Sequence, residues 1–134
     1  LGLEKDTHFL GWQKNPFKFL SRSKVFVLSS LWEGLPYVLI EAMACSLPVV
    51  SFDCKSGPRE ILAPNTDFNF DARGIEYANY GVLVENQRKD LLGQAIIKVI
   101  SDENLYNKFK EKSKERALDF EIKNIIKEWE FLEK

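Results

Sequence analysis

Short apolar runs alternate with amphipathic stretches along the first two thirds of the chain. Continuous apolar runs at 25–28, 47–52 and 81–84 are typical of strands that are covered on both faces of a parallel sheet. A further strand is expected to end at 8–11. Strands that alternate with helices in this order form βαβ units, so the pattern predicts an α/β fold.

Helices are predicted between these strands and throughout the last third of the chain. Pro16 and Pro36 each open an amphipathic stretch, and proline is favoured at the first helical position. The expected helices cover 16–21, 37–45, 57–62, 89–101, 102–119 and 121–134. The last has one apolar stripe at helical spacing, made of Ile122, Ile125, Ile126, Trp129 and Leu132. The connection 63–80 is unusually long, and such connections are usually functional or mobile.

Three or four strands are fewer than a doubly wound sheet normally has. The chain opens at Leu1 without an initiator Met, a basic region or an apolar leader. We therefore expect the missing strands to precede Leu1, with 1–86 forming the sheet portion of a partial domain and 87–134 its terminal helices. No run reaches the ~18 apolar residues that a transmembrane helix needs, so no transmembrane helix is expected in this stretch.

The composition gives no indication of a nucleic-acid partner or of a zinc site. The 134 residues carry 19 Lys and Arg against 20 Asp and Glu, a net charge of −1, which supplies no basic surface for nucleic acid. Hydrophobic residues make up 45%, which is typical of a globular domain. Cys45 and Cys54 have neither CxxC spacing nor further Cys and His to complete a zinc site. We interpret them as reduced, buried thiols of a cytoplasmic protein, and a disulfide between them is the alternative.

Several kinds of site lack their motif in this sequence. There is no DxD triplet and no GxGxxG, and His8 is the one histidine. The segment 67–71 begins like a calcium loop, but Ala72 stands where glycine is required and Ala78 where the bidentate Glu should be. We therefore expect no metal site, no nicotinamide site and no catalytic triad.

Candidate chemistry gathers in the segment 29–45. Glu41 is the one formal charge in the apolar stretch 35–50, and a buried carboxylate needs charged or hydrogen-bonding partners. Either it pairs with a basic residue such as Arg59, or it accepts hydrogen bonds from the hydroxyls of a ligand. Both readings remain open at this point.

Glu33 lies between the predicted strand 25–28 and the predicted helix that Pro36 opens. Ligands of parallel sheets bind outside the carboxyl ends of the strands, and the free amides of a helix start attract anionic groups. Gly34 lets a ligand approach the backbone closely. The alternative is that Glu33 only favours the helix dipole. Together the two carboxylates suit a polar, partly anionic ligand such as a nucleotide sugar.

The two glutamates also carry a family resemblance. Glu33, seven intervening residues and Glu41, set in SSLWEGLPYVLIEAMACSLPVVS, closely resemble the signature of retaining glycosyltransferases of the GT-B fold, in the large sequence family numbered 4. The blocks HFLGWQKNP, SGPREIL and YGVLV fall in the order and spacing of the C-terminal, donor-binding domain of that family. The resemblance covers residues 1 to 101, and it implies a Rossmann-like parallel sheet, truncated at its N-terminus, with a C-terminal helical tail.

The resemblance implies roles for individual residues. Glu33 would be the catalytic-site residue that contacts hydroxyls of the donor sugar, and Glu41 would hold the ribose hydroxyls of the nucleotide. The other implied donor-binding residues are Ser30 in support of Glu33, Gly34, Leu35 and Pro36 along the sugar and diphosphate, Gly11 and Trp12 beside the base, and Gly57. Gly57 belongs to a turn in which the family often has two consecutive glycines. The corresponding residues in this sequence are Ser56 and Gly57.

The resemblance also implies a reaction and its partners. A hexose or N-acetylhexosamine would pass with retention from a nucleotide sugar, by expectation a UDP-sugar, to a glycan or lipid-linked acceptor in polysaccharide or glycoconjugate biosynthesis. No cofactor or metal is expected, because the family usually stabilises the leaving diphosphate with an Arg and a Lys in its first βα segment. That segment and a separate N-terminal domain would lie upstream of Leu1, so we expect this stretch alone to be inactive.

Two alternative functions are also compatible with the sequence. The chain could be a non-catalytic α/β module that binds a nucleotide or a partner, or an unrelated doubly wound enzyme such as an epimerase. The motif style, DCKSGPREIL in particular, looks like bacterial enzymes of surface-polysaccharide assembly. We expect a cytoplasmic location, with the full-length protein peripheral at the inner membrane.

Overall fold

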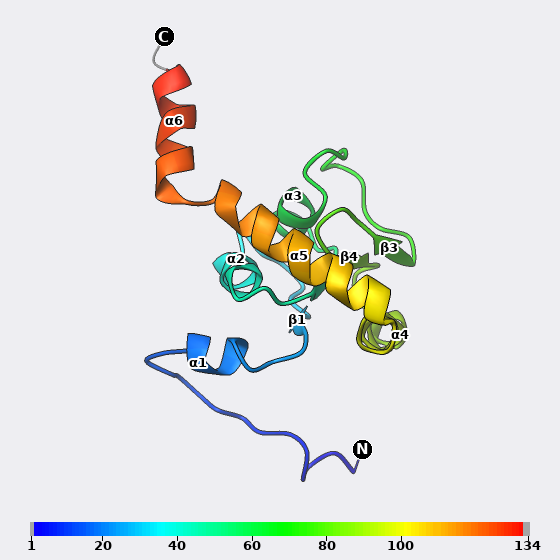
Figure 1. Cartoon of the computed structure of the whole chain (residues 1–134). Coiled ribbons are helices and arrows are strands. Elements are labelled where there is room, and N and C mark those ends of the chain that lie inside the picture. The colour runs from blue at the N-terminus through cyan, green and yellow to red at the C-terminus, as the bar shows by residue number, and fades with distance from the viewer. Residues whose placement is uncertain (1, 133–134) are drawn as a thin grey trace.

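Figure 1 shows the computed structural model of the chain, which describes the backbone of residues 2–132 and the side chains of 2–127, 129 and 130. Helices and strands alternate from α1 to β3, β4 follows β3 directly, and the chain then continues as helices. The helices are α1 (Phe17–Leu20), α2 (Tyr37–Ala44), α3 (Pro58–Leu62), α4 (Lys89–Ser101), α5 (Glu103–Asp119) and α6 (Ile122–Leu132). The strands are β1 (Phe26–Leu28), β2 (Val49–Phe52), β3 (Ile75–Tyr77) and β4 (Val82–Val84).

The strands form one sheet in the order β1-β2-β4-β3. β1 pairs in parallel with β2, with Phe26 opposite Val49, and β2 pairs in parallel with β4, with Val50 opposite Val82. β3 is antiparallel to β4 and forms one edge. The predicted α/β fold and its three apolar strands are therefore confirmed.

The core lies on both faces of this sheet. On one face, Leu39 and Met43 of α2 and Ile61 of α3 pack with Leu83 of β4. On the other face, Val50 of β2 packs with residues of α4 and with Phe109 of α5. Burial on both faces explains why the strands are continuously apolar rather than alternating.

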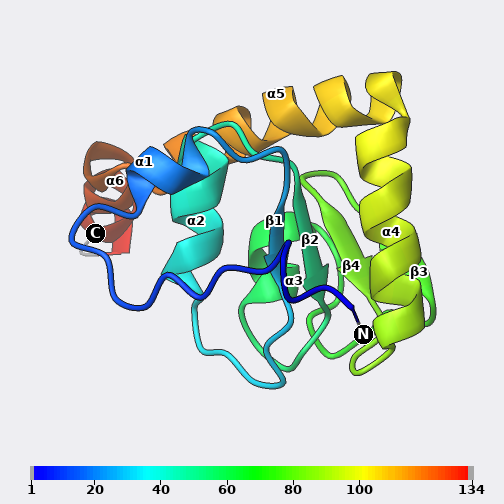
Figure 2. The ribbon, with the colours of Figure 1, turned by 90° about the horizontal axis from the view of Figure 1, so that it is seen from below.

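Helix α5 joins the two faces, since it runs along one end of the sheet from the α4 side to the α2 side (Figure 2). Phe109 belongs to the core cluster with α4, whereas Ala117 and Phe120 pack against the cluster with α2. The Ser113 hydroxyl donates to the carbonyl of Leu47 at 2.7 Å inside the protein, which ties α5 to the turn before β2.

Two sequence expectations are corrected. Residues 8–11 form no strand, and Phe9 is 97% exposed. A strand satisfies its backbone groups through a neighbouring strand, and no described strand pairs with this segment. The long connection 63–80 contains β3, which the sequence analysis did not place there, because β3 is short and only half-buried and so shows little apolar periodicity.

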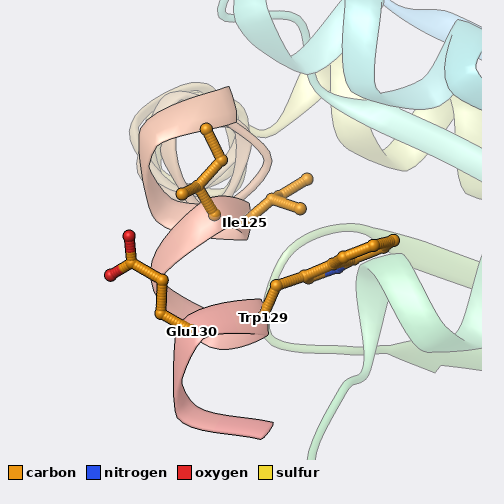
Figure 3. Close-up of a pocket in the computed structure, with 4 residues that line it drawn as sticks. Ile125, Trp129 and Glu130 are labelled. Atoms are coloured by element: carbon orange, nitrogen blue, oxygen red, sulfur yellow. The ribbon is translucent and has the colours of Figure 1, made fainter. Parts of the chain in front are cut away.

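Helix α6 leads away from the sheet at the C-terminal end (Figure 1). The predicted apolar stripe is present and exposed at Ile122, Ile125, Ile126 and Trp129, while the side chain of Leu132 lies outside the described residues. Figure 3 shows Trp129 and Glu130 pointing to different sides of the helix, and a cavity of about 410 Å³ is lined by Ile125, Ile126, Trp129 and Glu130. This cavity has few polar groups, so it is a weak candidate for a catalytic site.

Among residues 2–132, no helix combines the length and apolarity needed to cross a membrane.

Phe109 offers a test of the packing between α4, α5 and the sheet. Phe109→Ala should lower the free energy of unfolding by about 3–5 kcal/mol, because Phe109 is fully buried and its loss leaves a cavity. Phe68→Ala is the matched control, since Phe68 is 54% exposed and its loss should change stability little. Urea unfolding followed by circular dichroism measures both, and equal midpoints for the two variants would contradict this packing.

Candidate functional site

The candidate site lies at the carboxyl edge of the parallel strands. The loops 29–36, 53–57 and 85–88 follow β1, β2 and β4, and parallel pairing brings them to the same edge. Figure 2 shows these loops together at one end of the sheet, opposite α5. Ligands of open parallel sheets bind at this edge.

The turn before α2 carries most of the predicted donor-binding residues. Ser30 and Glu33 are half-buried, Gly34 and Leu35 are exposed, and Pro36 is buried directly before α2. The turn therefore presents Glu33 and the backbone of Gly34 and Leu35 next to a helix N-terminus.

Gly57 packs against this turn from the loop that follows β2. Its φ is +80°, and a Cβ there would collide with the carbonyl oxygen of Gly34 and the ring of Pro36. Its N–H donates to Glu60 Oε1 at 3.2 Å. The neighbouring Ser56 also has a positive φ, of 65°. Glycine at position 57 is therefore required by both backbone conformation and space, and Ser56 adopts the left-handed conformation that glycine would adopt freely.

Glu41 lies one turn into α2, half-buried between the fully buried neighbours Leu39 and Met43. The suggested salt bridge to Arg59 is wrong, because Arg59 pairs with Asp53 and Glu76. Within the described residues, no side chain or backbone group donates a hydrogen bond to the Glu41 carboxylate. Its oxygens are therefore free to accept hydrogen bonds from a ligand.

Cys54 follows β2, and its thiol is influenced by the charge of Glu33 in the candidate site. Burial raises the pKa of its thiol, and the nearby negative charge of Glu33 raises it further. Both cysteines are free, as the sequence predicts, but only Cys54 is buried as expected, whereas Cys45 is half-buried. The effect of Glu33 on Cys54 places the Glu33 carboxylate near the loop that follows β2.

A buried ion network fixes that loop. Arg59 is only 4% exposed, and its Nη2 lies 2.5 Å from Asp53 Oδ2 and 2.7 Å from Glu76 Oε2. Asp53 Oδ2 also accepts from the backbone N–H of Ala72 at 2.6 Å, and Arg59 Nη1 donates to Thr66 Oγ1 at 3.2 Å. The network thus joins the end of β2, α3, β3 and the connection between them.

The charge of Arg59 is secured by its partners. Burial lowers the pKa of the guanidinium, but hydrogen bonds and the negative charges of Glu76 and Asp53 raise it on balance. Arg59 therefore stays charged in the interior, where its two carboxylate partners compensate the loss of water.

Gly11 and Trp12 are not brought to this site. They lie in the exposed N-terminal segment, where Gly11 has a φ of +60° and Trp12 is 86% exposed. The side chain of Gln13 bonds within the same segment, to the carbonyl of Leu10 at 2.7 Å. The role of Gly11 and Trp12 beside a nucleotide base stays a prediction.

The sequence analysis missed a cavity of about 340 Å³ beside Glu33. Its walls come from four separate stretches, and they consist of Leu31, Trp32, Asp53, Lys55, Asp71, Ala72, Glu85 and Asn86. The sequence contains one signal that could have indicated this cavity: three of the four stretches follow predicted strands. Across the described residues, no cluster of three or more His, Cys, Asp or Glu is arranged to hold a metal ion.

A mostly parallel sheet covered by helices, with a glutamate-bearing turn and a helix start at its carboxyl edge, defines a Rossmann-like α/β class of domain. The chain belongs to the family of glycosyl transferases group 1, which matches residues 1–116. The resemblance to a GT-B glycosyltransferase C-terminal domain is thereby confirmed.

Individual relatives agree with this assignment. The chain is 43% identical to an uncharacterized glycosyltransferase of Methanocaldococcus jannaschii, over 98% of this chain and 36% of the relative. It is 32% identical to the N-acetylgalactosamine-N,N'-diacetylbacillosaminyl-diphospho-undecaprenol 4-alpha-N-acetylgalactosaminyltransferase of Campylobacter jejuni, over 96% of this chain and 32% of the relative. The chain thus spans about a third of the length of these relatives.

The solved structures of TarM are similar as well. A mutant of S. aureus TarM in complex with Fondaparinux, alpha-GlcNAc-glycerol and UDP superposes with a TM-score of 0.76 at 27% identity, over 97% of this chain and 24% of TarM. This match extends the likeness from sequence to fold.

Gly57→Ala tests the contact between the two loops. The variant should lose about 1–3 kcal/mol of stability, because a side chain at positive φ is strained and this one also meets Gly34 and Pro36. Gly93→Ala is the control: Gly93 lies inside α4 with open space around it, so alanine should raise stability by up to about 1 kcal/mol. Thermal unfolding distinguishes the two, and a Gly57→Ala variant as stable as the parent chain would contradict the packing.

Arg59→Met tests the ion network. Removing one partner of a buried ion group leaves Asp53 and Glu76 uncompensated, so we expect a loss of about 3–5 kcal/mol. Arg88→Met is the matched control, because Arg88 pairs with Asp90 at the surface, where ion pairs contribute little. Denaturant unfolding measures both variants. A similar midpoint for both would show that the network does not hold the fold.

Proposed function

We propose that this chain is the nucleotide-sugar-binding part of a retaining glycosyltransferase. It would act on a UDP-sugar and transfer a hexose or N-acetylhexosamine to a glycan or lipid-linked acceptor. One observation carries the proposal: Glu33 and Glu41 flank the start of α2 at the carboxyl edge, and within the described residues neither carboxylate has a hydrogen-bonded or ion-paired partner. Carboxylates that the fold does not use are available for hydroxyl groups of a ligand.

The donor would lie along the start of α2. Glu33 would accept hydrogen bonds from hydroxyls of the sugar, and Gly34, which carries no side chain, would let the sugar approach the backbone. The first amides of α2 point toward the edge of the sheet and carry partial positive charge, which favours a diphosphate. Ser30 and Pro36 would help to fix the shape of this turn.

The nucleoside would lie further along the helix. Glu41 follows the helix start at Tyr37 by four residues, a rise of about 6 Å. This distance separates the diphosphate at the helix start from the ribose, whose two hydroxyls would donate to the Glu41 carboxylate. Glu33 would thus bind the sugar end of the nucleotide sugar, and Glu41 would bind its ribose.

The contribution of these residues to catalysis would be orientation and charge stabilisation. Retaining transfer within an ion pair needs the acceptor and the anomeric carbon held close together, and it needs the charge on the departing diphosphate to be stabilised. The dipole at the start of α2 would supply part of that stabilisation. Basic side chains upstream of Leu1 would supply the rest, as the family resemblance implies, with no metal or cofactor expected.

The names of the relatives support the choice of substrates. The Campylobacter jejuni relative is named for N-acetylgalactosaminyl transfer to an undecaprenol-linked diphospho-sugar, and the TarM complex contains UDP. A lipid-linked acceptor would also be consistent with a cytoplasmic protein that works at the inner membrane, together with an N-terminal domain of the same enzyme.

Donor binding tests the proposal. The chain should bind UDP and UDP-sugars, and a ligand at a hundredfold excess over its Kd should stabilise it by about 2.7 kcal/mol. Glu41→Gln should weaken the binding of free UDP at least tenfold, because the amide has one accepting oxygen instead of two and carries no charge. Glu33→Gln should leave UDP binding unchanged and remove the discrimination among UDP-sugars. Isothermal titration calorimetry measures each affinity.

Glu103→Gln is the control for the two glutamate variants, since Glu103 is exposed at the start of α5, away from the proposed site. Equal loss of UDP affinity in Glu33→Gln and Glu41→Gln would contradict the assigned roles. The absence of any UDP or UDP-sugar binding would favour a non-catalytic partner-binding module instead.

A further inference from the structure

The cavity beside Trp32 is separate from the proposed donor site. It is about 340 Å³ in volume, and none of the residues assigned to the donor lines it. Trp32 nevertheless directly precedes Glu33 in the chain. The cavity therefore lies next to the proposed reaction centre, on the side of the turn that faces β2 and β4.

The lining of the cavity has the chemistry of a carbohydrate site. Trp32 is 81% exposed, and the face of an indole ring packs well against the apolar C–H face of a pyranose. Asp71 and Glu85 offer carboxylate oxygens that accept hydrogen bonds from sugar hydroxyls, and Lys55 offers a donor. One apolar face with a few polar groups around it is typical of sites that bind small polar ligands.

Asn86 supplies an independent observation. Among the buried side-chain nitrogen and oxygen atoms of the described residues, its Oδ1 has no hydrogen-bond partner. Buried polar atoms are nearly always paired, so an unpaired one needs an explanation. Asn86 also lines the cavity, so this unpaired atom belongs to a residue of the cavity wall.

The wall of the cavity is held in place by the fold. Asp71 precedes Ala72, whose N–H is bound to Asp53 at 2.6 Å, and Asp53 is itself held by Arg59. Glu85 Oε2 accepts from the N–H of Gly74 at 2.9 Å. A wall fixed before binding reduces the entropy that a ligand must offset.

The cavity continues into a second one of about 380 Å³. The two share Asp71, Ala72 and Glu85, and the second adds Asn69, Phe70 and Arg73. A nucleotide sugar carries one transferable sugar, whereas an acceptor glycan is a chain. Two adjoining cavities therefore fit consecutive residues of an acceptor better than they fit a donor.

We propose that these two cavities form an acceptor subsite in which Trp32 stacks on one pyranose of the acceptor glycan and Asp71 and Glu85 hold its hydroxyls. The assignment as acceptor rests on the proposed glycosyltransferase function. The connection 63–80 then has a role: it forms the outer wall of the subsite, and the Arg59 network positions it.

The test uses the 134-residue chain and four simple probes, the methyl α-glycosides of glucose, galactose, N-acetylglucosamine and N-acetylgalactosamine. At least one glycoside should cause a saturable change in the Trp32 indole N–H signal in NMR spectra, with the signal assigned from a Trp32→Phe variant. Trp32→Ala and the near-isosteric Asp71→Asn should each weaken this binding at least tenfold and leave UDP affinity unchanged. Trp129→Ala is the matched control, since Trp129 is 72% exposed on α6, and it should bind the glycoside as the parent chain does.

The outcomes separate the two proposals. If UDP binds but none of the four glycosides shifts the Trp32 signal, the acceptor subsite is wrong and the donor site stands. If a glycoside shifts Trp129 as strongly as Trp32, binding is nonspecific and the subsite is also wrong. If a glycoside binds at Trp32 but UDP does not bind, the carbohydrate site is supported and the donor site is overturned.

Discussion

The structure of the carboxyl edge depends on one buried guanidinium. The charge of Arg59 would be costly to bury without the carboxylates of Asp53 and Glu76. With them, Arg59 joins α3 to the end of β2 and to β3, three elements that are separated in the sequence. The short helix that carries Arg59 begins directly after Gly57, which packs on the turn before α2. A side chain that is not itself assigned to the donor thus fixes the loops around it.

The carboxylates of this edge fall into two groups with different uses. Asp53 and Glu76 are committed to Arg59, so they hold the fold and have little capacity left for a ligand. Glu33 and Glu41 have no such partner within the described residues, and both lie beside the start of α2. This division explains how one edge can be rigid and still offer acceptors to hydroxyl groups. It also agrees with membership of the glycosyl transferases group 1 family.

Much of the fold could be predicted because the parallel strands are buried on both faces and therefore read as continuous apolar runs. β3 escaped prediction because it is a short, half-buried edge strand. That omission also hid Glu76, one of the two partners of Arg59, so a pairing of Arg59 with Glu41 stayed open as one of two alternatives. The Glu33 and Glu41 pair could be found from its setting in the sequence. The cavity beside Trp32 could not, since loops distant in sequence form it only in the folded chain.

The most direct measurement is a crystal structure of the chain with a bound UDP-sugar. The account predicts that the ribose hydroxyls lie within hydrogen-bond distance of the Glu41 carboxylate, that the diphosphate lies at the start of α2, and that the sugar contacts Glu33. A nucleotide bound elsewhere, for example in the apolar cavity on α6, with Glu33 and Glu41 left in contact with solvent alone, would contradict it.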